Sequence, residues 1–143
     1  TTEIYTLSLH DALPICAGKA GFRNGIQSFI DNYGSSLERT GRFVPLSIKL
    51  PLFLKWIAKN YTETSDRIVE VKDAGDHYLY INKRCPVCWG RHPTTPDCHI
   101  TLGFLQEATS FISNGAQFQI RQITSIGAGD ASCDFIVPKR PIE

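Results

Sequence analysis

The spacing of apolar residues switches between a helical and a strand period along this chain, which restricts it to folds that combine helices with a sheet. Between residues 22 and 33 the apolar positions recur every three or four residues, as on one face of an amphipathic helix. Gly34 predicts the end of this helix, and the polar stretch 35–41 predicts a loop. A second helix is predicted from Leu50 to Tyr61, with Pro51 in its first turn.

The middle and the end of the chain add strands around a third helix. Residues 68–71 and 77–81 are rich in β-branched and aromatic side chains on either side of a turn-like segment, which predicts a β-hairpin. A Thr-Pro pair predicts a helix that begins near residue 95 and ends at Asn114-Gly115. Two last strands follow, at 118–124 and 133–137, joined by the turn Gly127-Ala-Gly-Asp130.

This order predicts an α+β fold in one domain. N-terminal helices come first, and an antiparallel sheet is built from two hairpins that flank a third helix. The chain has 143 residues, of which 42% are hydrophobic and 20% charged, and its formal net charge is +1. This balance excludes a strongly basic nucleic-acid binder and an acidic disordered chain, so we expect no direct nucleic-acid binding. No stretch approaches the roughly 20 unbroken apolar residues of a membrane span.

The first fifteen residues resemble something other than a protein family. TTEIYTLSLHDALPI matches, residue for residue, the translation of a widely used short-read sequencing adapter. We therefore expect residues 1–15 to be an adapter-derived artefact, and 16–143 to be a single domain that is truncated at its N-terminus. For this reason we base no functional prediction on His10 or Cys16.

Four further cysteines give the clearest chemical signal. Cys85 and Cys88 form a CxxC pair, which can present two thiolates to a tetrahedral zinc ion or act as a redox dithiol. Cys98 is expected in the first turn of the third helix, where a thiolate is favoured, and Cys133 at the start of the last strand. Four cysteines can also form disulfides in a secreted protein, and free cysteines are often small buried core residues.

Several aromatic side chains are candidates for the wall of an apolar pocket, because such walls bind apolar ligands by burial. The same side chains can simply fill the core. His99 is expected on the third helix and can contact a ligand or a metal, or be an ordinary hydrogen-bonded helix residue. The candidate ligand-binding residues are Tyr80, Trp89, His99, Phe104, Phe111 and Phe118.

Three motifs resemble the 4-vinyl reductase domain, a family described as a predicted hydrocarbon-binding domain. They are CPVCWGR at 85–91, Cys98-His99 leading into LGFLQ at 102–106, and GDASCDF at 129–135. The likeness runs over about residues 22–138. It implies an α+β fold related to the TRAPP subunits of vesicle tethering, with homodimerisation as one consequence. Cytoplasmic bacterial and archaeal members are typical of the family.

The same resemblance implies a function. Family members form the sensor half of phenol-responsive and toluene-responsive transcription activators, and one member is linked to reduction of the bacteriochlorophyll 4-vinyl group. We therefore expect a sensory or regulatory domain that binds a small apolar or aromatic molecule. The alternatives are a reductase or reductase subunit that acts on a tetrapyrrole vinyl group, and a zinc-stabilised interaction or dimerisation module. An enzyme acting alone is the less favoured reading, because the chain has no Gly-rich dinucleotide fingerprint.

The resemblance also implies a zinc site, in altered form. The phenol sensors hold zinc with Cys, Glu, Cys and Cys, and by motif the first and last ligands fall on Cys98 and Cys133. The other two fall near Gln122 and Ser125, which are poor zinc ligands. If the CxxC pair replaces them, the predicted zinc ligands are Cys85, Cys88, Cys98 and Cys133.

Overall fold

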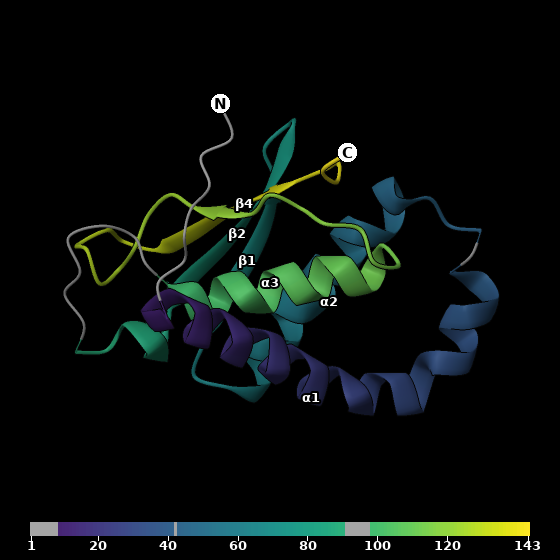
Figure 1. Ribbon diagram of the computed structural model, residues 1–143, viewed down its shortest axis with the longest axis horizontal. Coiled ribbons are helices and arrows are strands. Elements are labelled where there is room, and N and C mark those ends of the chain that lie inside the picture. Colours follow the sequence, from purple (N-terminus) through teal and green to yellow (C-terminus); the bar gives the residue numbers. More distant parts are fainter. Residues whose placement is uncertain (1–8, 42, 91–97) are drawn as a thin grey trace.

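The computed structural model describes residues 9–41, 43–90 and 98–143, without the side chains of 9–11, 28–29 and 32–40. These described residues form three α-helices, a short 3₁₀ helix and four strands, so the predicted α+β class is confirmed (Figure 1). In chain order the elements are α1 (Leu9–Thr40), α2 (Leu46–Thr64), β1 (Ile68–Asp73), β2 (His77–Arg84), η1 (Pro86–Cys88), α3 (His99–Ile112), β3 (Arg121–Gln122) and β4 (Cys133–Pro138).

The four strands form one antiparallel sheet in the order β1-β2-β4-β3. The predicted first hairpin is confirmed, and Gly75 in its turn has a φ of 97°, a conformation that glycine adopts without steric cost. The predicted strand 118–124 is wrong in its length, because only Arg121–Gln122 is assigned to β3. Upstream of β3, the N–H of Ile120 donates to the carbonyl of Phe118 within the segment instead of across to β4.

Both N-terminal helices are longer than predicted. The predicted stop at Gly34 and loop at 35–41 are wrong, because α1 continues to Thr40. Glycine weakens a helix by only about 1 kcal/mol, so a single glycine permits a stop without enforcing one. Pro51 is not in a first turn either, since α2 begins at Leu46, directly after the extended Pro45. The backbone N–H groups of Ile48 and Lys49 donate to the Pro45 carbonyl, and the helix begins there.

The third helix ends where the sequence predicted. Asn114 and Gly115 both have positive φ, and the N–H of Gly115 donates to the carbonyl of Ser110 over 2.7 Å. The predicted start at Thr95-Pro96 lies outside the described residues. Within them α3 begins at His99, so the predicted place of Cys98 in the first turn is wrong, and Cys98 is instead the N-cap. No helix in the described part of the chain is both long and apolar enough to span a membrane.

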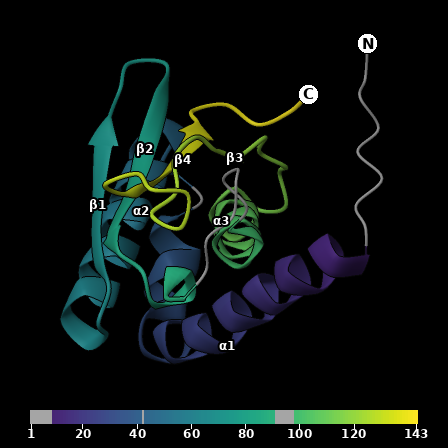
Figure 2. The same cartoon turned by 90° about the vertical axis from the view of Figure 1, so that its left-hand side faces the viewer.

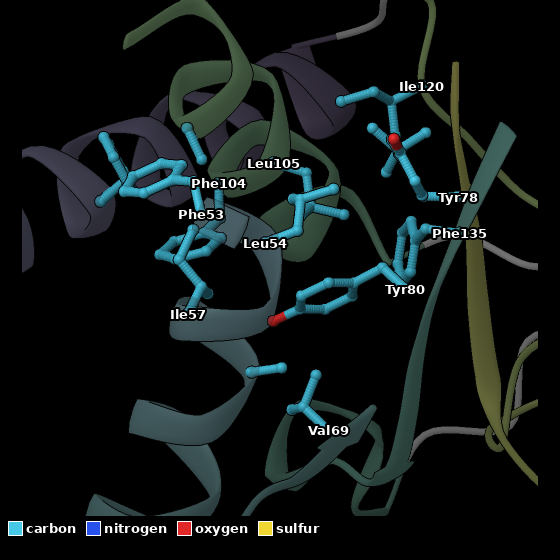
Figure 3. Close-up of a cluster of buried hydrophobic side chains, with 14 of the residues drawn as sticks. Phe53, Leu54, Ile57, Val69, Tyr78, Tyr80, Phe104, Leu105, Ile120 and Phe135 are labelled. Carbon is cyan, nitrogen blue, oxygen red and sulfur yellow. The ribbon is translucent and has the colours of Figure 1, made fainter. Parts of the chain in front are cut away.

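All three helices lie on one side of the sheet. Figure 2 shows α2 and α3 next to the sheet and α1 running along α3 on the side away from it. On β4 the buried residues alternate with half-buried ones, and the buried set faces the helices. The core between the sheet and the helices is drawn in Figure 3 and includes Leu54, Ile57, Tyr80, Leu105 and Phe135.

The start of α1 overlaps the segment that resembles an adapter. Residues 9–15 are helical and continuous with the rest of α1, and Ile15 is buried. The assignment of residues 1–15 to an adapter stays a prediction.

Candidate functional site

A groove of about 380 Å³ lies between α1 and α3. Its apolar lining comes from Phe22, Ile26 and Ile30 on α1 and from Phe111 on α3. Polar groups complete the lining, and among them the Arg23 Nε donates to the Glu107 Oε1 over 2.8 Å, from one helix to the other. The remaining lining residues are Gln27, Ser110, Asn114 and Gly115. The groove therefore combines an apolar floor with polar groups, as small-molecule sites do.

Beneath this groove lies a cluster of aromatic rings from all three helices, which we call the aromatic cluster. Phe22 is at its centre, with its ring centroid 5.3 Å from that of Phe104 and 5.8 Å from that of Phe111. Phe53 on α2 lies 5.8 Å from Phe111, and Tyr61 lies 5.2 Å from Phe104. Most of these pairs are tilted or edge-to-face, the arrangements that aromatic rings prefer. A flat aromatic ligand in the groove would meet ring edges and faces on its floor.

The structure brings two of the six predicted ligand-binding residues to this place. Phe104 and Phe111 belong to the aromatic cluster, and Phe111 also lines the groove. Tyr80 is buried against Phe135 at the sheet, with the ring centroids 6.4 Å apart. The other three do not line the groove. Phe118 is buried, Trp89 is highly exposed and His99 is half-buried.

The α1 side of the groove was missed as a site from the sequence. Phe22, Ile26 and Ile30 were recognised there only as the apolar face of a helix. The helical spacing of these apolar residues was the only indication in the sequence. It shows that this face of the helix packs against another part of the protein, but it does not identify that part. The pair Arg23–Glu107 joins positions 84 residues apart, so nothing local in the sequence indicates it.

The four predicted metal ligands do come together, at the other end of α3. Cys85 is the N-cap of η1 and Cys88 its last residue, Cys98 caps α3, and Cys133 opens β4. All four are free and buried, and we call them the thiol cluster. The Sγ atoms of Cys88 and Cys133 are 3.3 Å apart.

Contacts inside the thiol cluster shift its pKa values in both directions. The hydrogen bond with the Cys98 thiol holds the pKa of Cys85 below its usual value, and the same bond raises the pKa of Cys98, with burial adding to the effect. Burial, and then the contact with Cys133, raise the pKa of Cys88 to about 11. Cys85 thus ionises more readily than Cys88 and Cys98.

Of the two residues at the other ligand positions that the motif resemblance implies, Gln122 has both polar atoms of its side chain hydrogen-bonded, and Ser125 is held by its backbone. The Gln122 Oε1 accepts a hydrogen bond from the N–H of Cys98 at 2.7 Å, and its Nε2 donates to the carbonyl of Thr124. Ser125 is buried in the turn, where its N–H donates to Asp130. Over residues 9–41, 43–90 and 98–143, no group of three or more His, Cys, Asp or Glu side chains is disposed around a metal-sized site as it stands.

Comparison with known proteins places the fold. No protein-family model matches the chain, and no curated protein matches it. Among solved structures, the phenol-responsive sensory domain of the transcription activator PoxR, in complex with phenol, is similar with a TM-score of 0.59 and 16% identity, over 93% of this chain and 67% of that one. The chain shares its fold.

A trafficking protein particle complex subunit 3 from Naegleria fowleri, covalently bound to palmitic acid, is similar as well. Its TM-score is 0.57 and its identity 14%, over 89% of this chain and 80% of that one. The relation to TRAPP subunits that the sequence motifs implied is therefore confirmed for the fold. At such low identities the likeness carries no function by itself.

Proposed function

We propose that this chain is a sensory or regulatory domain of the 4-vinyl reductase type that binds a small apolar or aromatic molecule in the groove between α1 and α3. The observation that carries the proposal is the aromatic cluster under the groove, because burial of apolar surface against rings is how such molecules are held. The polar pair Arg23–Glu107 in its lining offers a hydroxyl-bearing ligand a hydrogen-bonding partner.

The similar structures support this choice of ligand class. The PoxR domain was solved with phenol, an aromatic molecule with one hydroxyl, and the trafficking subunit carries a long apolar acyl chain. Because all five cysteines are free, we also propose a reducing compartment such as the cytoplasm. The alternative functions, a reductase or a homodimerisation module, rest on the motif resemblance alone. None of the residues that line the groove favours either alternative over ligand binding.

Filling the groove with a bulky side chain tests the proposal. Ser110 lines the groove and is half-buried on α3, so a Ser110→Trp side chain would occupy ligand space. Ser47→Trp is the matched control, because Ser47 is exposed on α2 and absent from the groove lining. In calorimetric titrations with phenol and with toluene, we expect saturable binding to the unmodified chain, at least about tenfold weaker binding to Ser110→Trp, and an unchanged affinity for Ser47→Trp.

Equal affinity of the two tryptophan variants would place the ligand outside the groove. Absence of saturable heat with both probes in the unmodified, folded chain would remove the proposed ligand class.

A further inference from the structure

The outer edge of β1 has no partner strand in the described part of the chain. β1 comes first in the sheet order β1-β2-β4-β3, and Figure 2 shows it at one edge of the sheet. Only its side toward β2 is paired. An unpaired edge presents backbone N–H and C=O groups that can pair with another chain. With six residues, β1 is long enough to accept an additional strand.

The hydrogen bonds identify the backbone groups that face outward. Just after β1, the N–H of Ala74 donates to the carbonyl of His77 over 2.9 Å, so the even-numbered positions face β2. Successive residues of a strand direct their backbone groups to opposite sides, so Val69 and Val71 face the outer edge. Thr62 on α2 agrees with this direction. Its Oγ1 accepts from the N–H of Val69 at 3.0 Å and lies 3.3 Å from the carbonyl oxygen of Val69.

The edge is therefore closed at one position and open at the next. Thr62 covers the backbone groups of Val69, and no other side chain among the described residues covers those of Val71 in this way. A groove of about 390 Å³ lies between α2 and this edge, with apolar lining from Ala58, Val69 and Val71. The Val71 side chain is only half-buried, so apolar area remains for a bound segment to cover.

The charged groups of this groove leave an excess of positive charge. Each of its two glutamates lies near a lysine, with Nζ–Oε1 distances of 3.9 Å and 2.6 Å. Asp73, at the end of β1, is paired with Lys139 at 2.8 Å. Lys55 and Lys72 are exposed, and within residues 9–41, 43–90 and 98–143 neither forms an ion pair. The charged lining residues are Lys55, Lys59, Glu63, Glu70 and Lys72.

We propose that the outer edge of β1 binds an extended acidic segment of a partner protein, which adds to the sheet as a further strand. The N–H and C=O of Val71 pair with the backbone of the segment, and Thr62 sets one end of the paired region. Alternate apolar side chains of the segment cover Ala58 and Val71, as in other complexes formed by strand addition. Its carboxylates lie near the ammonium groups of Lys55 and Lys72. A second copy of this chain would bring the same excess of positive charge to the edge and is disfavoured for that reason.

Titration with two capped hexapeptides tests the proposal. One peptide alternates valine with glutamate and the other alternates valine with lysine, and fluorescence anisotropy of a label on the peptide reports binding to the full chain. We expect saturable binding of the glutamate peptide and at least about tenfold weaker binding of the lysine peptide. Binding of the glutamate peptide is expected to weaken as salt is added, because the charged groups are exposed.

Two variants separate the charge of the edge from its backbone. Lys72→Glu is expected to weaken binding of the glutamate peptide about 3–10-fold. Arg121→Glu is its matched control, because it makes the same charge change at an exposed position of β3, the opposite edge of the sheet, and it is expected to leave the affinity unchanged. Val71→Pro removes the outward N–H without removing a hydrogen bond to β2, and at least about tenfold weaker binding is expected. Val71→Ile keeps the N–H and is expected to bind normally.

The lysine peptide and Lys72→Glu keep the test valid if Val71→Pro folds poorly, since neither alters the backbone of β1. Absence of saturable binding by the glutamate peptide would overturn the proposal, as would equal affinity for the two peptides. Unchanged affinity in Lys72→Glu, or in folded Val71→Pro, would overturn it too. A dimer in analytical ultracentrifugation that Val71→Pro dissociates would overturn it in favour of a second copy at this edge. None of these outcomes depends on whether the α1–α3 groove binds a ligand.

Discussion

Replacement of Gly18 by alanine is expected to lower the free energy of unfolding by about 3 kcal/mol, the upper end of the cost of overpacking. α1 and α3 approach so closely here that a Cβ on Gly18 would overlap the carbonyl oxygen of Ile100 and lie 2.8 Å from the backbone nitrogen of Phe104. The obstruction is backbone, which no side-chain rotation relieves. For a chain of this length the change corresponds to a fall in Tm of about 10 °C, measurable by circular dichroism.

Gly21→Ala on the same helix is the matched control for this prediction. A Cβ at Gly21 meets nothing within 4 Å, so only the helix-forming gain of alanine remains, about 0.5–1 kcal/mol. The two substitutions are chemically identical and should move Tm in opposite directions. A rise in Tm for both would show that α1 does not pack on α3 at Gly18, and the groove between these helices would lose its structural basis.

Phe135→Ala carries the second large expected effect, a loss of about 3–5 kcal/mol in the free energy of unfolding. Phe135 is fully buried at the centre of β4, opposite Tyr80 in the register and in ring contact with it. Truncation removes the ring from between the sheet and the helices and leaves a cavity there. Urea denaturation followed by circular dichroism reports the loss as a lower midpoint.

The neighbouring Ile136 provides the control on the opposite face of the same strand. Its side chain is half-buried, because no helix in the described part of the chain covers that face of the sheet. Ile136→Ala is expected to cost less than half as much as Phe135→Ala, since less apolar area leaves water there on folding. Equal losses at the two positions would mean that both faces of the sheet are covered, contrary to the arrangement in Figure 2.

Local sequence accounts for the elements that depend on near neighbours. The β1–β2 hairpin follows from two runs that are rich in β-branched and aromatic residues on either side of the turn-like segment 72–76. The end of α3 follows from Asn114-Gly115, whose backbone adopts positive φ at little cost. The extension of α1 past Gly34 was not predictable in this way, because one glycine leaves the balance between helix and loop to residues elsewhere.

Residue types and the spacing of apolar residues therefore determined the α+β class and the order of the elements. They also singled out the four cysteines that prove to be buried. Which of these residues contact one another was decided by the tertiary structure. Phe22 and Phe111 line one groove, and Cys88 touches Cys133, only because the helices cross and the strands pair at particular registers. A periodic pattern states that a face must be buried but not against what, since burial of apolar surface is non-directional. Gly18 shows the reverse case, where a residue without a side chain sets how closely two helices approach.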